Sequence, residues 1–333
     1  MKRVLLALLA AALTLGAEAA VKAKPRKTVV SAVSSALNPY RRTPYVGAIS
    51  LNAKTGKVMF SDGADSPARP ASVTKLMTAL LVLEDVKAGR YALADDVVAT
   101  DAVYKSEPSW VGIKVGEKMS VGDMLTALMV ESANDVAIAL AVKSAGSIQE
   151  FVAKMNARAR ALGMTGTTYY NPNGLPPSAK YPWKGFNVTT ARDQSLLALE
   201  LVRNHPEILR YTSVKTCDLI RRPGGFRTAV TRSANGGEPK TTALAPGEKV
   251  EKVLRNHNNV MVKDKLKLIN SDGREAVDGL KTGYIDAGGS SVVLTGTRGG
   301  QRAIVVVLGS ASAAVRDDNA SRLMTDALGS LAW

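Results

Sequence analysis

The stretch RPASVTKLMTALL, residues 69–81, decides which fold and which chemistry this sequence predicts. Its apolar residues recur three and four positions apart, as in an amphipathic helix, and Pro70 stands where helices often begin. Lys75 contradicts the pattern, because a cation in the first helical turn faces exposed N–H groups and the positive end of the helix dipole. A capping box would place Glu or Gln, not lysine, three residues after Ser72. The lysine makes sense if Ser72 and Lys75, which share a helix face at this spacing, are a nucleophile and its base.

Lysine is a reasonable base for this serine. Its pKa can be lowered by burial or by a neighbouring cation, and a serine near a helix start can offer its own N–H to a developing oxyanion. The sequence gives little support for a Ser-His-Asp triad, because its only histidines, His205 and His257, lie in NHPEIL and RNHNNV, which are unpromising contexts for a catalytic base. A Ser-x-x-Lys pattern arises by chance about once in a chain of this composition, so the interpretation depends on further motifs.

Composition and charge argue against several other classes of function. The single cysteine, Cys217, has no partner for an intrachain disulfide, and neither it nor the histidines have metal-ligand spacing, so no metal or cofactor is expected. The formal net charge is +15, but the basic residues are scattered and only 5% of residues are aromatic, which argues against nucleic-acid binding. The polyanionic partners expected for such a basic chain are the anionic surface of a cell envelope or an acidic substrate.

The N-terminal segment has the features of a secretory signal. Residues 1–19, MKRVLLALLAAALTLGAEA, combine a basic head, an apolar run of about 12 residues and small residues at Ala17 and Ala19. They predict secretion across the cytoplasmic membrane to a periplasmic or cell-envelope location, as a soluble protein. Residues 20–44 contain basic residues and no acid, and are expected to form a solvated linker that could lie along an anionic envelope surface.

The folded domain is expected at residues 45–331. Apolar runs on both sides of AKTG (53–56) predict a hairpin, and helices are expected to dominate about residues 90–212. Residues 220–250 are polar and glycine-rich, and predict an extended hairpin or a loop. Three strands and a helix from about residue 317 are expected to follow. Capping boxes before three of the helices begin at Ser120, Ser147 and Thr190.

The order of these elements predicts the fold class. If the first hairpin and the last three strands join one sheet, the helical region is an insertion on one side of it. The expected fold is α/β (α+β), an antiparallel sheet flanked by helices with an inserted all-helical subdomain. A cleft between the sheet and the insertion is the expected place for a site.

Two short motifs, Ser-x-Asn and Lys-Thr-Gly, each occur more than once, and their context separates the copies. Ser-Ala-Asn at 132–134 lies in a tight break between two apolar helical segments, where a polar pair would be held rigidly and could face a cleft. Lys-Thr-Gly at 281–283 opens an apolar strand, whose edge could align a peptide while glycine allows close approach. The copies at 50–52, 54–56 and 233–235 fall on a strand before a turn, in a hairpin turn and in a loop, and are not selected.

With these motifs in order, the chain from about Tyr45 to Leu323 resembles the low-molecular-mass penicillin-binding proteins of the D-alanyl-D-alanine carboxypeptidase and endopeptidase type. SVTK (72–75), SAN (132–134) and KTG (281–283) carry the resemblance, and RPAS, SANDVAIALA, NPNGL, TARD and NHNNVM support it. The resemblance implies a β-lactamase/transpeptidase-like fold. It also implies a serine-type D-Ala-D-Ala carboxypeptidase that acts on peptidoglycan stem peptides without a cofactor and is inhibited by β-lactams.

The resemblance further implies a role for each residue of the motifs. Ser72 would attack the carbonyl between two D-alanines, Lys75 would take its proton, and Ser132 would relay protons. The N–H groups of Ser72 and Tyr284 would form the oxyanion hole. The substrate would be held by Asn134 at its amide, by Lys281, Thr282 and Arg316 at its terminal carboxylate, and by the strand residues Gly283 and Tyr284.

Two features depart from the family pattern. After Lys-Thr-Gly the chain reads YIDAGGS (284–290), which differs from the usual family stretch and leaves the rim of the pocket open. The chain stops at Trp333, so neither a C-terminal β domain nor an anchor helix is expected.

Three alternatives to a carboxypeptidase remain. A D-alanyl-D-alanine endopeptidase that cuts cross-links would use the same residues. A serine β-lactamase would need a carboxylate to activate water, and Glu200-x-x-x-Asn204 lies inside a helix and too far past Ser132. A non-catalytic envelope-binding module would not require a lysine in a first helical turn, so Lys75 argues against it.

Overall fold

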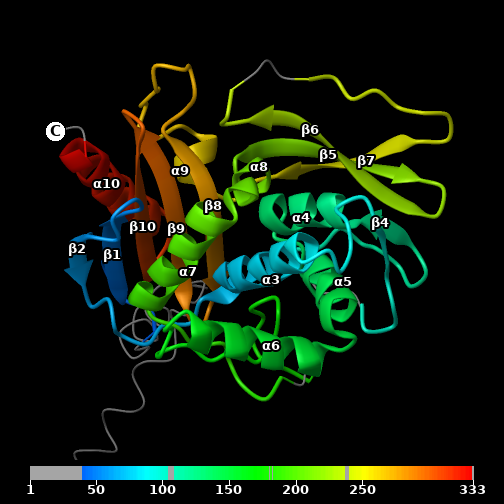
Figure 1. Cartoon of the computed structure of the whole chain (residues 1–333), viewed down its shortest axis with the longest axis horizontal. Helices are drawn as coiled ribbons and strands as arrows, with labels where there is room; N and C mark the ends of the chain where they lie inside the picture. Colours follow the sequence, from blue (N-terminus) through cyan, green and yellow to red (C-terminus); the bar gives the residue numbers. More distant parts are fainter. Residues whose placement is uncertain (1–39, 104–108, 180, 182, 237–239, 332–333) are drawn as a thin grey trace, which may run out of the picture. The chain divides into compact units, whose positions relative to one another are not determined.

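The computed structural model describes residues 40–103, 109–179, 181, 183–236 and 240–331 (Figure 1). The expected secretory signal at 1–19 and residues 20–39 of the expected linker lie outside this part of the chain.

The end of the expected linker belongs to the folded domain. The backbone N–H of Arg42 donates to the carbonyl of Gly309 at 2.8 Å, and the Arg41 guanidinium donates to the carbonyl of Ala311 at 2.6 and 3.0 Å. The end of the expected linker is therefore tied to the last strand at these two residues, while Arg42 itself remains exposed and Arg41 is half-buried.

A five-stranded antiparallel sheet lies on the left of the molecule in the view of Figure 1. Its order is β2-β1-β10-β9-β8, so the first hairpin and the last three strands join one sheet, as predicted. The hairpin turns at residues 54–56, where Gly56 has φ +78°, a conformation that glycine adopts without strain. β8 forms one edge and pairs with β9 so that Lys281 lies opposite Val293. The strands are β1 (Gly47–Asn52), β2 (Val58–Asp62), β8 (Val277–Ile285), β9 (Gly289–Arg298) and β10 (Gln301–Ser310).

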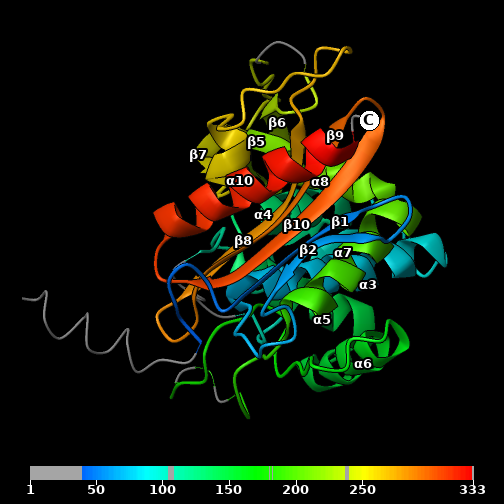
Figure 2. The same cartoon turned by 90° about the vertical axis from the view of Figure 1, so that its left-hand side faces the viewer.

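Helices cover both faces of this sheet, which is why its inner strands are apolar and buried along most of their length. α10 (Ala313–Leu331) lies across one face against β9 and β10, as Figure 2 shows. α7 (Ala191–Asn204) covers the other face, beside the 3₁₀ turn η1 (Ala71–Thr74) and α3 (Lys75–Lys87). The helix predicted over 70–81 therefore begins as a 3₁₀ turn. α3 is apolar on most sides because other helices and β8 enclose it.

The insertion contains the expected helices, and the three capping predictions are confirmed. The side chains of Ser120, Ser147 and Thr190 accept hydrogen bonds from the backbone N–H three residues later. The helices are α4 (Val121–Val130), α5 (Asn134–Ala145), α6 (Ile148–Ala161), η2 (Pro206–Ile208) and α8 (Leu209–Thr212), and α9 (Asn259–Val262) follows later in the chain. Among the described residues, no single helix has both the length and the apolarity to cross a membrane. α5 and α6 meet these criteria only together, and they are bent by 83° at the break between them.

The expectation of an all-helical insertion is wrong, because part of it forms strands. β3 (Asp96–Val98) and β4 (Lys118–Ser120) pair with each other and join a second five-stranded sheet of order β3-β4-β6-β5-β7. Its longer strands are β5 (Val214–Arg222), β6 (Gly225–Ser233) and β7 (Lys249–Arg255). Strands as short as β3 and β4 carry little periodic signal, and β4 finds its partner β6 in a distant part of the chain.

Candidate active site

The first motif places its serine and its lysine in direct contact. Ser72 lies in η1, Lys75 is the first residue of α3, and 2.8 Å separate Lys75 Nζ from Ser72 Oγ. Lys75 Nζ also lies 2.8 Å from the side-chain oxygen of Asn134 and 2.7 Å from the backbone carbonyl oxygen of Asn173. None of these three partners is a carboxylate, so none of them holds the lysine in its charged form by ion pairing.

Burial holds the pKa of Lys75 well below the ordinary value of a lysine. The residue is 0% exposed, so its charged form is deprived of hydration. The positive charge of Lys281 lowers the pKa further, while the carboxylate of Asp135 opposes the shift. A neutral lysine in contact with the Ser72 hydroxyl can accept its proton.

The second motif lies in the break between α4 and α5, as its sequence predicts. Ser132 has φ +63°, a left-handed conformation that is uncommon for a residue with a side chain. The Asp135 carboxylate accepts hydrogen bonds from the backbone N–H groups of Val111 and Gly112 at 3.1 and 2.8 Å, which fixes the neighbouring loop. Within the described residues, the buried Ser132 Oγ has no hydrogen-bond partner. Its hydroxyl is therefore available to a bound substrate.

The third motif lies on the edge strand β8. Lys281 is 2% exposed, and its Nζ donates to the carbonyl of Thr282 at 3.1 Å. Burial, together with the positive charge of Arg316, lowers the pKa of Lys281 to about 7. Gly283 allows β8 to approach η1 and Ser72, because a Cβ at this position would lie 2.4 Å from the carbonyl oxygen of Pro70.

A cavity of about 320 Å³ lies where the three motifs meet. Lys75 and Lys281 do not line it, since they are buried beside Ser72 and Thr282. The structure thus brings all the predicted site residues to one place. Those that line the cavity are Ser72, Ser132, Asn134, Thr282, Gly283, Tyr284 and, from α10, Arg316.

The cavity also contains residues outside the predicted set. Two motifs in the sequence could have located four of them: NPNGL contains Gly174 and Leu175, and NHNNVM contains His257 and Asn259. A Cβ on Gly174 would lie 1.9 Å from the carbonyl oxygen of Ala71, so glycine is required for this loop to touch η1. The additional lining residues are Ser109, Gly174, Leu175, His257, Asn259, Ile285 and Ala313.

Arg316 and His257 give one part of the cavity its charge and its hydrogen-bonding groups. Arg316 is 4% exposed, and its guanidinium donates to the carboxylate of Asp317 at 2.6 and 2.9 Å. Burial and then the positive charges of Lys281, Lys75 and Arg316 lower the pKa of His257 to about 4. The imidazole is therefore neutral at pH 7, and the charge available to an anion comes from the arginine and from Lys281.

A network of buried side-chain amides positions the loop that contacts Lys75. Asn171 Oδ1 accepts a hydrogen bond from the backbone N–H of Asn173 at 3.3 Å. The Asn187 amide donates to the carbonyl of Asn171 at 3.0 Å and to the hydroxyl of Thr74 at 2.9 Å. Because Thr74 immediately precedes Lys75, these hydrogen bonds connect the loop to the turn that carries Ser72.

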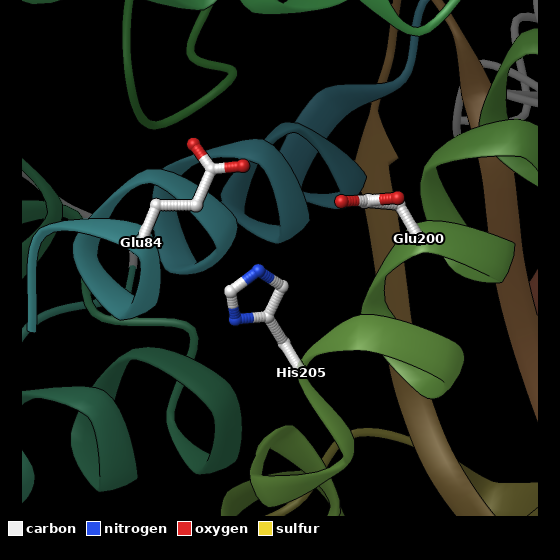
Figure 3. Close-up of side chains that lie close together, drawn as sticks. All are labelled: Glu84, Glu200 and His205. Atoms are coloured by element: carbon white, nitrogen blue, oxygen red, sulfur yellow. The ribbon is translucent and has the colours of Figure 1, made fainter. Parts of the chain in front are cut away.

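A second group of ionisable side chains lies elsewhere in the domain. Glu84, Glu200 and His205 have ligand-type atoms within 4.8 Å of one another, and Figure 3 shows them on α3 and at the end of α7. Arg158 donates to Glu84 at 2.7 Å and to Glu200 at 2.6 Å, so these carboxylates are already paired with a cation. Asn204 also donates to Glu200, at 2.7 Å. None of these residues lines the cavity, which agrees with Glu200 being a structural residue of a helix rather than a base for deacylation.

Comparison with known proteins gives a consistent result. A family model described as D-alanyl-D-alanine carboxypeptidase (peptidase S11) matches residues 46–222. D-alanyl-D-alanine carboxypeptidase DacC of Escherichia coli strain K12 is 30% identical over 285 residues, which cover 83% of this chain and 59% of that protein. A D-alanyl-D-alanine endopeptidase of Pseudomonas aeruginosa is 34% identical over 212 residues, which cover 60% of this chain and 64% of that protein.

A solved structure of similar fold is penicillin-binding protein D2 from Listeria monocytogenes in its ampicillin-bound form. It is 27% identical, its TM-score is 0.64, and the match covers 85% of this chain and 96% of that one. The chain spans about three fifths of the length of the curated carboxypeptidases that it matches first.

Proposed function

Because the chain belongs to the peptidase S11 family of D-alanyl-D-alanine carboxypeptidases, we propose that it is a serine-type D-Ala-D-Ala carboxypeptidase acting on peptidoglycan stem peptides. The observation that carries the proposal is the buried Lys75 Nζ, 2.8 Å from Ser72 Oγ and without a carboxylate among its hydrogen-bond partners. A lysine whose charged form is disfavoured by burial in this way can act as a base for the serine hydroxyl.

Acylation begins when Ser72 Oγ attacks the carbonyl carbon between the two D-alanines and its proton passes to Lys75. The oxyanion accepts hydrogen bonds from the backbone N–H groups of Ser72 and Tyr284. The C–N bond then breaks, the proton returns through Ser132 to the departing amine, and D-alanine leaves. Water hydrolyses the ester on Ser72 by the same route in reverse, which restores the enzyme.

Substrate is held at both sides of the scissile bond. Its terminal carboxylate binds to Lys281, Thr282 and Arg316, and its amide binds to Asn134. The low exposure of Lys281 and Arg316 supports this role. An ion pair between these cations and the ligand carboxylate would be shielded from water, and it would discriminate strongly between a carboxylate and a neutral end group.

A D-alanyl-D-alanine endopeptidase is the second candidate. The observation in its favour is the higher identity, 34%, to the endopeptidase of Pseudomonas aeruginosa over the 212 matched residues. Both reactions use the same acyl-enzyme, and they differ in whether the leaving group is free D-alanine or a cross-linked amine.

We further propose that residues 1–19 direct secretion to the periplasm or cell envelope, and that residues 20–39 lie along its anionic surface. The apolar run and small-residue end of the first segment and the basic composition of the second support this.

β-Lactams are expected to acylate Ser72, as the ampicillin-bound form of the Listeria protein suggests for a chain of similar fold.

The test is intact mass spectrometry of the full chain mixed with benzylpenicillin and followed over time. A single long-lived adduct that is absent in Ser72→Ala is expected, with release of D-alanine from an N-acyl-Lys-D-Ala-D-Ala peptide. Ser132→Ala should slow acylation about a hundredfold, whereas Ser233→Ala, in the unselected Ser-Ala-Asn copy, should not.

The other outcomes identify the competing functions. Release of amine only from cross-linked dimers favours the endopeptidase, and an adduct that disappears within seconds while penicillin is hydrolysed favours a β-lactamase. A folded chain that forms no adduct and hydrolyses nothing contradicts the proposal and favours a binding module.

A further inference from the structure

We propose that Arg69 is a positioning residue that clamps the segment after Lys-Thr-Gly to the turn carrying Ser72, and that this clamp fixes the two backbone N–H groups of the oxyanion hole relative to each other. The inference rests on the proposed acyl-enzyme function, in which the N–H groups of Ser72 and Tyr284 bind the oxyanion. It gives a role to the stretch YIDAGGS (284–290), in which the chain departs from the family pattern.

The Arg69 guanidinium lies between two aromatic rings. Its central carbon is 4.2 Å from the ring centre of Tyr40 and 3.9 Å from that of Phe186. Arg69 is half-buried, and the attraction between a cation and a ring face is stronger where water is excluded. Because a guanidinium is planar, a ring on either side limits the orientations that it can adopt. Its N–H groups therefore point in a defined direction.

The guanidinium donates to the loop that follows β8. Arg69 Nη1 lies 3.0 Å from the carbonyl oxygen of Ala287. The two backbones also meet here, since a Cβ on Gly288 would lie 2.8 Å from the Cβ of Arg69 and 3.0 Å from its carbonyl oxygen. The N–H of Gly288 donates to the carbonyl of Ile285 at 3.0 Å, which closes the loop into a turn. Arg69 thus holds a compact turn rather than a loose end.

The two ends of the clamp flank the proposed oxyanion hole. Arg69 lies three residues before Ser72, and Ala287 lies three residues after Tyr284. Between these ends β8 lies against η1, where a Cβ on Gly283 would be 3.1 Å from the backbone nitrogen of Ser72. An oxyanion hole works only when its donors point at one oxygen position. A hydrogen bond that joins the two segments beside the hole opposes their separation.

The segments that supply the rings are themselves anchored to the domain. Ala68 and Thr189 exchange backbone hydrogen bonds at 2.7 and 2.9 Å, which brings the segment of Phe186 alongside Arg69. Tyr40 immediately precedes the two arginines that donate to backbone carbonyls at the end of β10. The clamp therefore includes the N-terminal end of the described chain, which carries none of the three motifs.

The test compares the wild-type full chain with Arg69→Gln, which removes the cation and its planar stack. We would measure kcat and KM for release of D-alanine from the N-acyl-Lys-D-Ala-D-Ala peptide, and the acylation constant with benzylpenicillin. We expect kcat to fall about tenfold at unchanged KM, because a misaligned oxyanion hole weakens binding of the transition state only. Acylation by benzylpenicillin should fall by a similar factor.

A second variant, Phe186→Leu, removes one ring and should give a smaller loss of kcat. It should cause no further loss in the Arg69→Gln background, because the ring acts through the arginine. The matched control is Arg203→Gln. Arg203 also donates to loop carbonyls, those of Ala53 and Lys54 at 2.6 and 2.9 Å, beside the unselected Lys-Thr-Gly copy. This control should leave kcat and KM unchanged.

The opposite results would overturn the clamp. If Arg69→Gln lowers the melting temperature but keeps the wild-type kcat, the arginine is only structural. A loss confined to KM, or losses from Arg69→Gln and Phe186→Leu that add in full, would contradict the proposal as well. If Arg69→Gln does not fold, Phe186→Leu alone decides by whether kcat falls at constant KM. A wild-type chain that forms no adduct with benzylpenicillin would instead overturn the proposed function.

Discussion

At the scale of single residues, the site depends on two buried lysines near an arginine. Burial lowers the pKa values of both lysines, with a further contribution from the charge of Lys281 at Lys75 and from the charge of Arg316 at Lys281. The two lysines would nevertheless be used in opposite protonation states. Lys75 acts as a base only when it is neutral, and Lys281 attracts a carboxylate only when it is charged. If the proposed function is correct, activity is expected in the pH range in which both conditions hold.

The second-order constant for acylation by benzylpenicillin is therefore expected to rise and then fall with pH. It rises as Lys75 loses its proton, and it falls above about pH 7 as Lys281, with its pKa of about 7, loses the charge that attracts the ligand. Lys281→Arg, which stays charged, should remove the falling limb. His257→Gln should leave both limbs in place, because a pKa of about 4 makes His257 neutral in this range. A falling limb that persists in Lys281→Arg contradicts the assignment.

At the scale of elements, the site depends on how closely β8 and the NPNGL loop approach η1. Gly283 and Gly174 lie where a side chain would collide with the backbone of Pro70 or Ala71. The two segments enclose the turn that carries Ser72, and the amide network through Asn187 connects that turn with the loop. Close backbone contact therefore sets the position of Ser72 relative to β8.

Gly283→Ala is expected to displace β8 and to slow acylation by benzylpenicillin about a hundredfold, because small misplacements of reacting groups are costly. The chain offers a matched control in its other Lys-Thr-Gly copy. Gly56→Ala, at φ +78°, should cost about 1 kcal/mol of stability through backbone strain without changing the acylation rate. Mass spectrometry and thermal melting of both variants would test this, and a Gly283→Ala chain that acylates normally would show that the close approach is unnecessary.

At the scale of the whole domain, α3 connects the site to the insertion. Ten residues beyond Lys75 along this helix, the fully buried Asp85 accepts hydrogen bonds from Arg90, Tyr91, Ser144 and Lys154. These partners lie beyond the end of α3, on α5 and on α6. Burial by itself raises the pKa of Asp85, but hydrogen bonds from Lys154, Ser144 and Arg90 outweigh it and hold the pKa below its ordinary value.

Asp85→Ala is expected to lower the free energy of unfolding by about 3 kcal/mol, because it leaves Lys154 without its buried partner. The remaining folded protein should still be acylated on Ser72. The pKa of Asp85 is lowered in the folded state. The contribution of Asp85 to the free energy of unfolding is therefore complete above the ordinary pKa range of aspartate, and it is lost as the pH falls through the lowered pKa. Asp65→Ala, which removes an exposed ion pair with Arg192, should change stability by less than about 1 kcal/mol. Equal melting temperatures for the two variants would contradict a special role for Asp85.

The sequence by itself determined the elements whose signal is local. The first hairpin, the helix caps at Ser120, Ser147 and Thr190 and the three last strands follow from periodicity and turn chemistry, and the structure confirms them. The sequence also predicted that the motif residues form one site, because a lysine in a first helical turn and a polar break between apolar helices are unfavourable unless they serve a function. The structure places these residues next to one another.

Only the tertiary structure decided the features that depend on distant partners. The second sheet forms because β4 meets β6, and neither short strand has a periodic pattern of its own. His257 and Leu175 enter the cavity because β8, α9 and the NPNGL loop converge there. The motifs NHNNVM and NPNGL mark these segments in the sequence, but only the fold brings them together. The lowered pKa values of Lys75 and Lys281 have the same origin, since burial and the approach of other charges exist only after the chain has folded.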